Sequence, residues 1–336
     1  VRTVIIKELE GFIYNNIRYL GEGDIIDSSS PETSYKVNYI NIIKPKYKKI
    51  KADGYITLEG KQSGTGSEQY SIVNVIKVDT EEKTSYWIRG NFSKKLWLRF
   101  GKGEYKITVH KTEIKKADLN YEGDIYAWSC WNPSYEFYVE NTRDEDGKFY
   151  YPSDAIQSDD PIIMEKAAEI VEGLNNDNDK IKAIHDWVAK YLYYDDDSLN
   201  DGKRKKQDAI SAYNNKTGVC EGYTSLLNAL LRASGYRVKA IEGTANGGGH
   251  AWSNILLGNK WYLIDVTWDD PGMYGDPVGP GGADDDPLGK NIRYTYYMLT
   301  TLTGVNKSHT PTDERIDRSI GNRDIYKWRG YPNGIY

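Results

Sequence analysis

The feature that most constrains this chain is the segment of residues 215–236, NKTGVCEGYTSLLNALLRASGY, because it marks both ends of a helix. Its apolar residues recur at i, i+4 and i+8, which predicts an amphipathic helix with one buried stripe. Thr217 or Gly218 can cap the start of this helix, and Gly235 can end it in the left-handed conformation. Cys220 then lies in the first turn, on the buried side.

A cysteine in that position suits a nucleophile. The N–H groups of a first helical turn have no partner inside the helix and carry a partial positive charge, which favours thiolate over thiol. They could also stabilise an oxyanion formed when the sulfur attacks a carbonyl. The plain alternative is that Cys220 packs as a small hydrophobic residue. A nucleophile needs a base and a group that orients the base, so the four histidines matter: His110, His185, His250 and His309.

His250 belongs to a predicted β-hairpin, GGGHAWSNILLGNKWYLIDVTWDDP, with strands at 250–257 and 261–268. If Gly258 and Asn259 form a two-residue loop, His250 and Asp265 are diagonal neighbours on one face. We predict that an Asp265 oxygen lies about 2.6 to 3.2 Å from one His250 nitrogen, with the other nitrogen turned toward Cys220. A three-residue loop would separate the two side chains.

These residues resemble a known family. GVCEGYTSLLNALLRASGY, GHAW and WYLIDVTWDDP are similar to the core of the transglutaminase-like superfamily, and the resemblance covers roughly residues 155 to 310. It implies a papain-like α+β fold and a catalytic triad of Cys220, His250 and Asp265. It does not fix the reaction, because the superfamily includes protein cross-linkers, peptidases, amidases and inactive members.

The region before this domain has a different pattern. Residues 35–142 contain short alternating runs separated by turn clusters, which is typical of an antiparallel β-sandwich. They also resemble the β-rich module that precedes some bacterial transglutaminase-like domains. With 336 residues, the chain is long enough for two domains. We predict an N-terminal extension at 1–34 that may include a helix, a sandwich at 35–150 and a catalytic domain at 151–336.

Composition excludes some partners and leaves others open. With 44 basic and 49 acidic residues, the net charge of −5 gives no electrostatic case for nucleic acid. No segment approaches 18 consecutive apolar residues, so no membrane span is predicted. The two cysteines suit a secreted enzyme and a cytoplasmic one equally well, so the prediction of a secreted or cell-surface enzyme rests mostly on the family resemblance.

Several residues beyond the triad have two interpretations each. Trp252 and Trp268 could line an acyl-binding channel or pack in the core, and Tyr213 could donate to the oxyanion. His185 fits helix packing, and His309 lies in a late loop that could border the site. Cys130 is interpreted as structural rather than as a disulfide partner of Cys220. The loop at 269–291 is rich in aspartate, so calcium is a candidate cofactor, although no known calcium-loop spacing is present.

The sequence therefore predicts a thiol enzyme that acts on peptide or protein amides through a thioester. The thioester would pass to water, giving a peptidase or amidase, or to an amine, giving a cross-linker. Two alternatives belong to another class: a catalytically silent peptide-binding protein and a glycan-binding surface protein. The second would use aromatic residues of the sandwich, which are Trp87, Trp97, Tyr105, Trp128 and Trp131.

Overall fold

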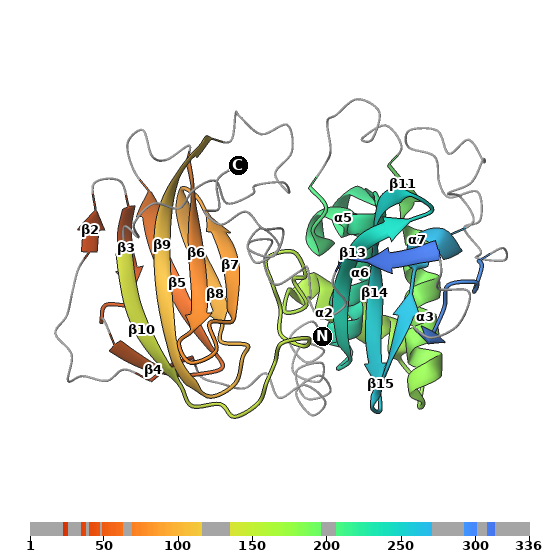
Figure 1. Cartoon of the computed structure of the whole chain (residues 1–336), viewed down its shortest axis with the longest axis horizontal. Helices are drawn as coiled ribbons and strands as arrows, with labels where there is room; N and C mark the ends of the chain where they lie inside the picture. The colour runs from red at the N-terminus through yellow and green to blue at the C-terminus, as the bar shows by residue number, and fades with distance from the viewer. Residues whose placement is uncertain are drawn as a thin grey trace, which may run out of the picture. The chain divides into compact units, whose positions relative to one another are not determined.

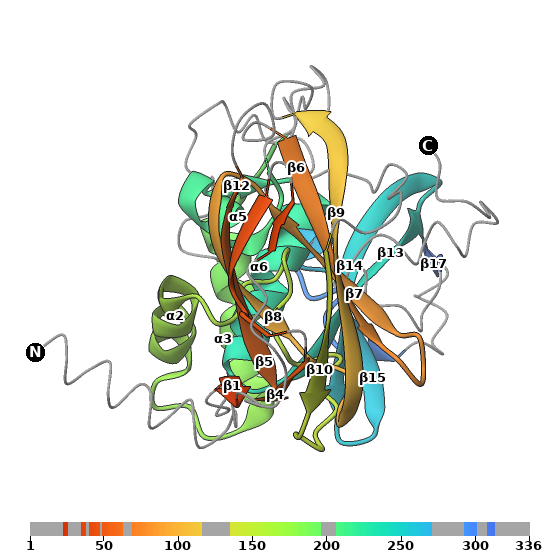
Figure 2. The same ribbon diagram turned by 90° about the vertical axis from the view of Figure 1, so that its left-hand side faces the viewer.

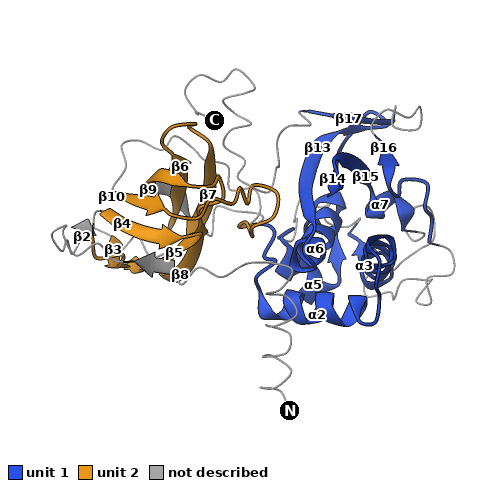
Figure 3. Cartoon of the chain, turned by 90° about the horizontal axis from the view of Figure 1, so that it is seen from below, with its two compact units in different colours: residues 1–18, 155–319 blue, residues 19–154, 320–336 orange. Residues whose placement is uncertain are grey.

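The structure is a computed structural model of the chain, and it describes residues 23–25, 35–37, 40–47, 49–62, 69–115, 135–195, 206–270, 292–300 and 308–312. The chain forms two compact units that meet in sequence between Asp154 and Ala155 (Figure 3). This division falls four residues after the predicted one. Tyr151 accounts for the shift, because its ring packs 5.0 Å from that of Trp97, which belongs to the strand-rich unit that precedes the boundary.

Unit 2, orange in Figure 3, is a sandwich of two sheets (Figures 1 and 2). One sheet has the order β1-β4-β10-β9-β6-β7, and its strands are β1 Gly23–Ile25, β4 Lys49–Asp53, β10 Tyr135–Asn141, β9 Gly103–Lys115, β6 Gln69–Lys77 and β7 Lys83–Ile88. The other has the order β2-β3-β5-β8, with β2 Tyr35–Val37, β3 Ile40–Lys44, β5 Tyr55–Gln62 and β8 Asn91–Trp97. Alternate residues of β5 and β6, including Ile56, Leu58, Val73 and Val75, enter one shared core.

Two details differ from the sequence prediction. The sandwich is not wholly antiparallel, because β10 runs parallel to β4, with Tyr138 opposite Lys49. These strands are far apart in the chain, so no short turn forces them to be antiparallel. The predicted extension at 1–34 also contributes β1, which pairs antiparallel with β4. The helix considered within that extension lies outside the described residues, as do Cys130, Trp128 and Trp131.

Of the three described aromatic residues expected to bind glycans, Trp97 and Tyr105 are buried and Trp87 is half-buried. Trp97 is buried and packs between the rings of Tyr55 and Tyr151. Tyr105 is fully buried, and its hydroxyl donates to Gly101 O at 2.7 Å. Neither ring offers a face to a sugar, because burial among neighbouring strands is the commoner use of strand aromatics.

Unit 1, blue in Figure 3, has α+β architecture, which agrees with the predicted fold class. Its five-stranded sheet has the order β16-β15-β14-β13-β17, with β16 Leu299–Thr300, β15 Lys260–Ile264, β14 Gly248–Leu257, β13 Arg237–Ala245 and β17 His309–Pro311. A short parallel pair joins β11 Tyr193–Tyr194 to β12 Thr217–Gly218. The helices are α2 Pro161–Val171, α3 Asp177–Tyr191, α5 Ala209–Asn215, α6 Cys220–Ala233 and α7 Val266–Asp269. None of the described helices is both long and apolar enough to cross a membrane.

Helix α6 is the centre of this unit and packs against β13 and β14 (Figure 1). It is buried on every side from Gly222 to Ala233, not along a single stripe as the sequence predicted. The reason is that α2, α3 and α5 cover the helix where the sheet does not. As predicted, Gly235 follows the helix at a positive φ of 93°.

Candidate active site

Cys220 is the first residue of α6, and its thiol is free. The N-cap is Val219 and not Thr217 or Gly218, because these two residues are extended and pair with β11. A valine has no side-chain acceptor, so it caps none of the first-turn N–H groups. The intrahelical bonds begin with Tyr223 N donating to Val219 O at 3.1 Å.

Gln207 supports this helix start, and the sequence analysis missed it. Its side chain is buried, and Oε1 accepts from Val219 N at 2.9 Å. A Cβ atom placed on Gly222 would lie 2.6 Å from the same oxygen, so a larger residue there would displace the Gln207 side chain from this contact. Gln207 stands apart from any periodic pattern, so the sequence carried no signal for this contact.

His250 is positioned by the hairpin that the sequence predicted. Leu257 pairs with Lys260 across the two-residue loop, and the predicted register continues to Ser253 opposite Ile264. The second strand ends there and not at residue 268, because Asp265 leaves the ladder and becomes the N-cap of α7. His250 Nε2 lies 2.7 Å from Asp265 Oδ2, as predicted.

Asp265 is an almost completely buried carboxylate whose two oxygens are both hydrogen-bonded. Oδ1 accepts from the backbone N–H groups of Thr267 and Trp268 at 3.1 and 3.2 Å. Oδ2 contacts His250 and also His309 Nε2, at 3.0 Å. Burial acts to raise the pKa of Asp265, but the two histidines outweigh it and hold the pKa below its usual value. The residue is therefore a fixed anion.

The charge on His250 follows from its two neighbours. Burial acts to lower the pKa of His250, but hydrogen bonds to Asp265 and Cys220, and the charges of those groups, raise it from 6.5 to about 10. Nε2 is engaged by Asp265, which leaves Nδ1 as the nitrogen for the thiol. The ring is thus protonated at neutral pH, as required for an imidazolium that pairs with a thiolate.

Two tryptophans enclose the histidine. The ring of Trp268 stacks 4.9 Å from that of His250, and the ring of Trp252 lies 6.1 Å away. Both indoles are buried, and Trp252 also packs with Ile241 and Leu263. These contacts place both side chains at the histidine, where they hold its ring and limit the access of water. The predicted acyl-binding channel stays a prediction.

Tyr213, for which an oxyanion role stays a prediction, packs against aromatic residues of α3. It lies on α5, and its ring stands 5.2 Å from Tyr191 and 6.1 Å from Trp187. Its carbonyl accepts from the Tyr191 hydroxyl at 2.9 Å. The short helix therefore turns the Tyr213 ring toward α3.

His185 packs inside the unit, as predicted, and does so within a network of charges. Nδ1 lies 3.0 Å from Asp186 Oδ1, and Nε2 lies 3.3 Å from Asp269 Oδ2. Burial acts to lower the pKa of His185, but the two carboxylates raise it. The contact between His185 and Asp269 links α3 to α7, and so helps to hold the short helix that Asp265 caps.

The calcium prediction receives no support from its described members. Asp269 faces His185, and Asp270 Oδ2 accepts from the Tyr223 hydroxyl. Both carboxylates are buried within the fold, so they do not belong to a solvated loop that offers ligands to calcium. The other aspartates of the loop lie outside the described residues.

One group among the described residues has donor atoms close enough to consider for a metal: His250, Asp265 and His309, whose ligand atoms lie within 4.8 Å of one another. The two histidine-to-carboxylate distances are 2.7 and 3.0 Å. Ligands in a tetrahedral zinc site stand about 3.3 Å apart, given metal–ligand bonds of about 2.0 to 2.1 Å. The distances between the histidine nitrogens and the carboxylate oxygen are those of hydrogen bonds, so the group is better described as a hydrogen-bonded cluster than as a metal site.

Comparison with known proteins agrees with this geometry. Residues 165–266 match the model of the Transglutaminase-like superfamily, a range that includes Cys220, His250 and Asp265. This part of the chain is therefore a transglutaminase-like domain. His309 lies beyond the matched range.

Curated relatives include kyphoscoliosis peptidase from Mus musculus and from Homo sapiens, each 22% identical over 118 residues. The match covers 32% of this chain and only 18% of each relative. Among solved structures, a candidate cysteine protease from Cytophaga hutchinsonii is 18% identical, with a TM-score of 0.32 over 70% of this chain and 68% of that one. A candidate protease from Parabacteroides distasonis is 13% identical, with a TM-score of 0.28 over 68% and 41%. These scores are too low to support conclusions about the fold.

Proposed function

We propose that this protein is a thiol enzyme that cleaves or transfers peptide or protein amides through a thioester. The observation that carries the proposal is the chain of contacts from Cys220 through His250 to Asp265, with the carboxylate 2.7 Å from the imidazole. A base held between a nucleophile and a buried anion is the arrangement that thiol catalysis needs.

The reaction would begin with the Cys220 thiolate attacking the amide carbonyl carbon. The resulting oxyanion would lie at the start of α6, where the Cys220 N–H and the helix dipole can stabilise it. The His250 imidazolium would give its proton to the departing amine as the carbon–nitrogen bond breaks. Neutral His250 would then take a proton from water or an incoming amine, which attacks the thioester and releases Cys220.

The choice between water and amine separates a peptidase or amidase from a cross-linker. The names of the curated relatives favour peptidase activity, and hence water as the acceptor. The alternative of a silent binding protein has less support, because a binding site has no need to bury a charged carboxylate behind a histidine.

The first test is the reactivity of Cys220. The protein is treated with iodoacetamide across pH, and labelling is measured on the peptide that contains Cys220, which separates it from Cys130. We expect labelling at neutral pH well above that of a free model thiol. The variant His250→Gln should lose this advantage while remaining folded. Labelling no faster than the model thiol would contradict the proposal.

The second test separates the reactions. A glutamine-containing peptide is offered with and without a primary amine. Ammonia release with amine incorporation would identify a cross-linker, ammonia release alone an amidase, and cleavage of the peptide backbone a peptidase. The variant Cys220→Ser is the matched control and should show none of these products.

A further inference from the structure

A second histidine shares the carboxylate that orients His250. Asp265 Oδ2 is 2.7 Å from His250 Nε2 and 3.0 Å from His309 Nε2, and the two imidazole rings lie 5.7 Å apart. His309 is 44 residues after Asp265 in the chain, so this contact is not a consequence of local geometry. His309 is therefore an additional member of the site besides Cys220, His250 and Asp265.

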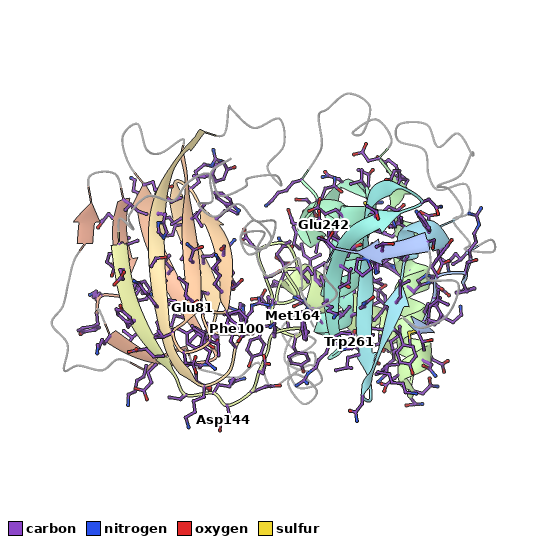
Figure 4. The ribbon with its side chains drawn as sticks, in the orientation of Figure 1. Glu81, Phe100, Asp144, Met164, Glu242 and Trp261 are labelled. Carbon is purple, nitrogen blue, oxygen red and sulfur yellow. The ribbon has the colours of Figure 1, made fainter. Side chains whose placement is uncertain are left out.

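The fold holds His309 in place from several directions. Strand β17 pairs with β13, with His309 opposite Ala245, and Thr312 N donates to the carbonyl of Glu242, which Figure 4 labels on β13. Gly243 permits this approach, because a Cβ atom there would lie 2.1 Å from Thr310 O. The side chain of His309 is 1% exposed.

Aromatic rings enclose His309 on its remaining sides. Trp268 is 4.7 Å away, Trp252 is 5.0 Å away and Tyr296 is 5.2 Å away, measured between ring centroids. Trp252 and Trp268 are the two side chains that also contact His250. The same walls therefore enclose both histidines and the carboxylate between them.

The hydrogen bonds of His309 define its tautomer. Nε2 faces Asp265, a carboxylate that can only accept, so Nε2 carries the proton. Nδ1 lies 2.9 Å from Ser308 Oγ, whose hydroxyl can donate to it. Both ring nitrogens of His309 therefore have a hydrogen-bond partner, and His309 gives Asp265 a second donor besides His250.

We propose that His309 is a positioning residue that fixes the Asp265 carboxylate and shares its charge, so that His250 is oriented without being held too strongly in its protonated form. The proposal rests on the proposed thiol chemistry of Cys220. His309 touches neither the nucleophile nor any reacting atom, and it acts only through Asp265.

The chemical reason is the double role of His250. A carboxylate with His250 as its only side-chain donor would concentrate its charge on that ring and make the imidazolium a weaker acid. The imidazolium must release its proton to the leaving amine, so excessive stabilisation would slow acylation. The other titratable groups around the pair are Cys220 on α6, Asp269 on α7 and Tyr296 beside the ring.

The test compares His309→Phe, which keeps a flat ring but donates no hydrogen bond, with His309→Gln, whose amide can donate to Asp265. The full-length protein is used, and labelling of Cys220 by iodoacetamide is followed from pH 5 to pH 11 on the Cys220 peptide. The upper step of that profile reports loss of the His250 proton. We expect the Phe variant to move this step upward by about half a pH unit or more, and the Gln variant to leave it close to wild type.

Turnover of the peptide substrate gives a second readout. We expect kcat of the Phe variant to fall about tenfold with KM nearly unchanged, and the Gln variant to recover most of the loss. A packing role would predict equal damage in both variants. The proposal is overturned if wild-type Cys220 labels rapidly but the Phe variant leaves the upper step unchanged or lower, or if the Gln variant is impaired equally. If wild-type Cys220 itself is unreactive, the thiol chemistry fails first, and this inference with it.

Discussion

Asp265 performs two tasks with different atoms. Oδ2 accepts hydrogen bonds from the two histidine rings, whereas Oδ1 accepts hydrogen bonds from the backbone N–H groups of Thr267 and Trp268. An alanine at this position would remove both tasks at once, and the loss of a helix cap alone costs about 1 kcal/mol of stability. An asparagine keeps an oxygen for the cap and removes only the charge.

We therefore expect Asp265→Asn to fold with a thermal midpoint near that of wild type and to lose two to four orders of magnitude in kcat, because His250 loses the anion that fixes its tautomer and charge. Asp265→Ala should lose similar activity and, in addition, stability. Steady-state kinetics and thermal unfolding of the two variants check this. An asparagine variant with more than a tenth of wild-type activity would contradict the assigned role.

The raised pKa of His250 also predicts how stability depends on pH. In the folded protein the value is about 10, and the unfolded value is 6.5. A group whose pKa is raised by folding contributes its full stability below the unfolded pKa and loses it as pH rises through the folded pKa. We expect the free energy of unfolding to fall by up to a few kcal/mol between pH 6.5 and pH 10.

Urea denaturation at pH 6.5, 8 and 10 measures this change, with His250→Gln as the reference. The variant lacks the titrating ring, so its stability should decline less over the same interval. Asp265 has the opposite sign: its lowered pKa contributes stability that is lost only on acidification. Equal slopes for the two proteins above pH 6.5 would show that His250 is not held as an imidazolium.

The residues differ in how far the sequence could predict them. The position of Cys220 in a first helical turn and the contact between His250 and Asp265 could be predicted, because a helix start and a hairpin loop are local features and the loop length fixes the register. His309 could not be placed, because its contact depends on β17 adding to the far side of β13. No local pattern reports such a long-range pairing.

At the scale of elements, the start of α6 is unusual in having no side-chain cap. Val219 is extended, with φ −83° and ψ −176°, which is the backbone conformation of an N-cap, yet its side chain can accept nothing. The sequence analysis assigned the cap to Thr217 or Gly218 because those residue types favour it. The short pairing of β11 with β12 overrides that preference. Because no side chain caps the first turn, its N–H groups are available to the oxyanion of the proposed reaction.

This arrangement predicts a conflict between stability and activity. Val219→Thr has nearly the same shape, and its hydroxyl can accept from a first-turn N–H, so the thermal midpoint should stay level or rise. The same bond would compete with the oxyanion, and we expect kcat to fall about tenfold while KM changes little. Val219→Ala is the control, because it adds no acceptor. Full activity in the threonine variant would show that the oxyanion does not use this turn.

Two other elements show why local patterns are incomplete. The strand of Asp265 was predicted to reach residue 268, but it ends at Ile264 because a carboxylate that caps two N–H groups is more stable than one that continues the ladder. Helix α6 was expected to be amphipathic, yet even Asn228 and Arg232 are fully buried. Periodicity identifies the most apolar face of a helix, but it does not show that other helices cover the rest.

At the scale of the whole molecule, the two larger hydrophobic cores of the described residues share no members. One is built by the two sheets of the sandwich, and the other by α6, its neighbouring helices and the five-stranded sheet. All residues of the candidate site belong to unit 1, which contains α6 and the five-stranded sheet. Separate cores predict separate unfolding events, because cooperativity depends on contacts within a core.

Calorimetry can therefore assign each transition with one variant per unit. His185→Leu breaks the buried pair with Asp269 and should lower only the transition of the catalytic unit, by an amount that corresponds to about 3 to 5 kcal/mol. Tyr105→Phe removes buried hydrogen bonds of the sandwich and should lower only the other transition, by about 1 to 2 kcal/mol. The fast labelling of Cys220 should fall to the rate of a model thiol at the transition of the catalytic unit and should not change at the other transition. If either variant shifts both transitions equally, the two units unfold as one, and their separate cores do not make them independent.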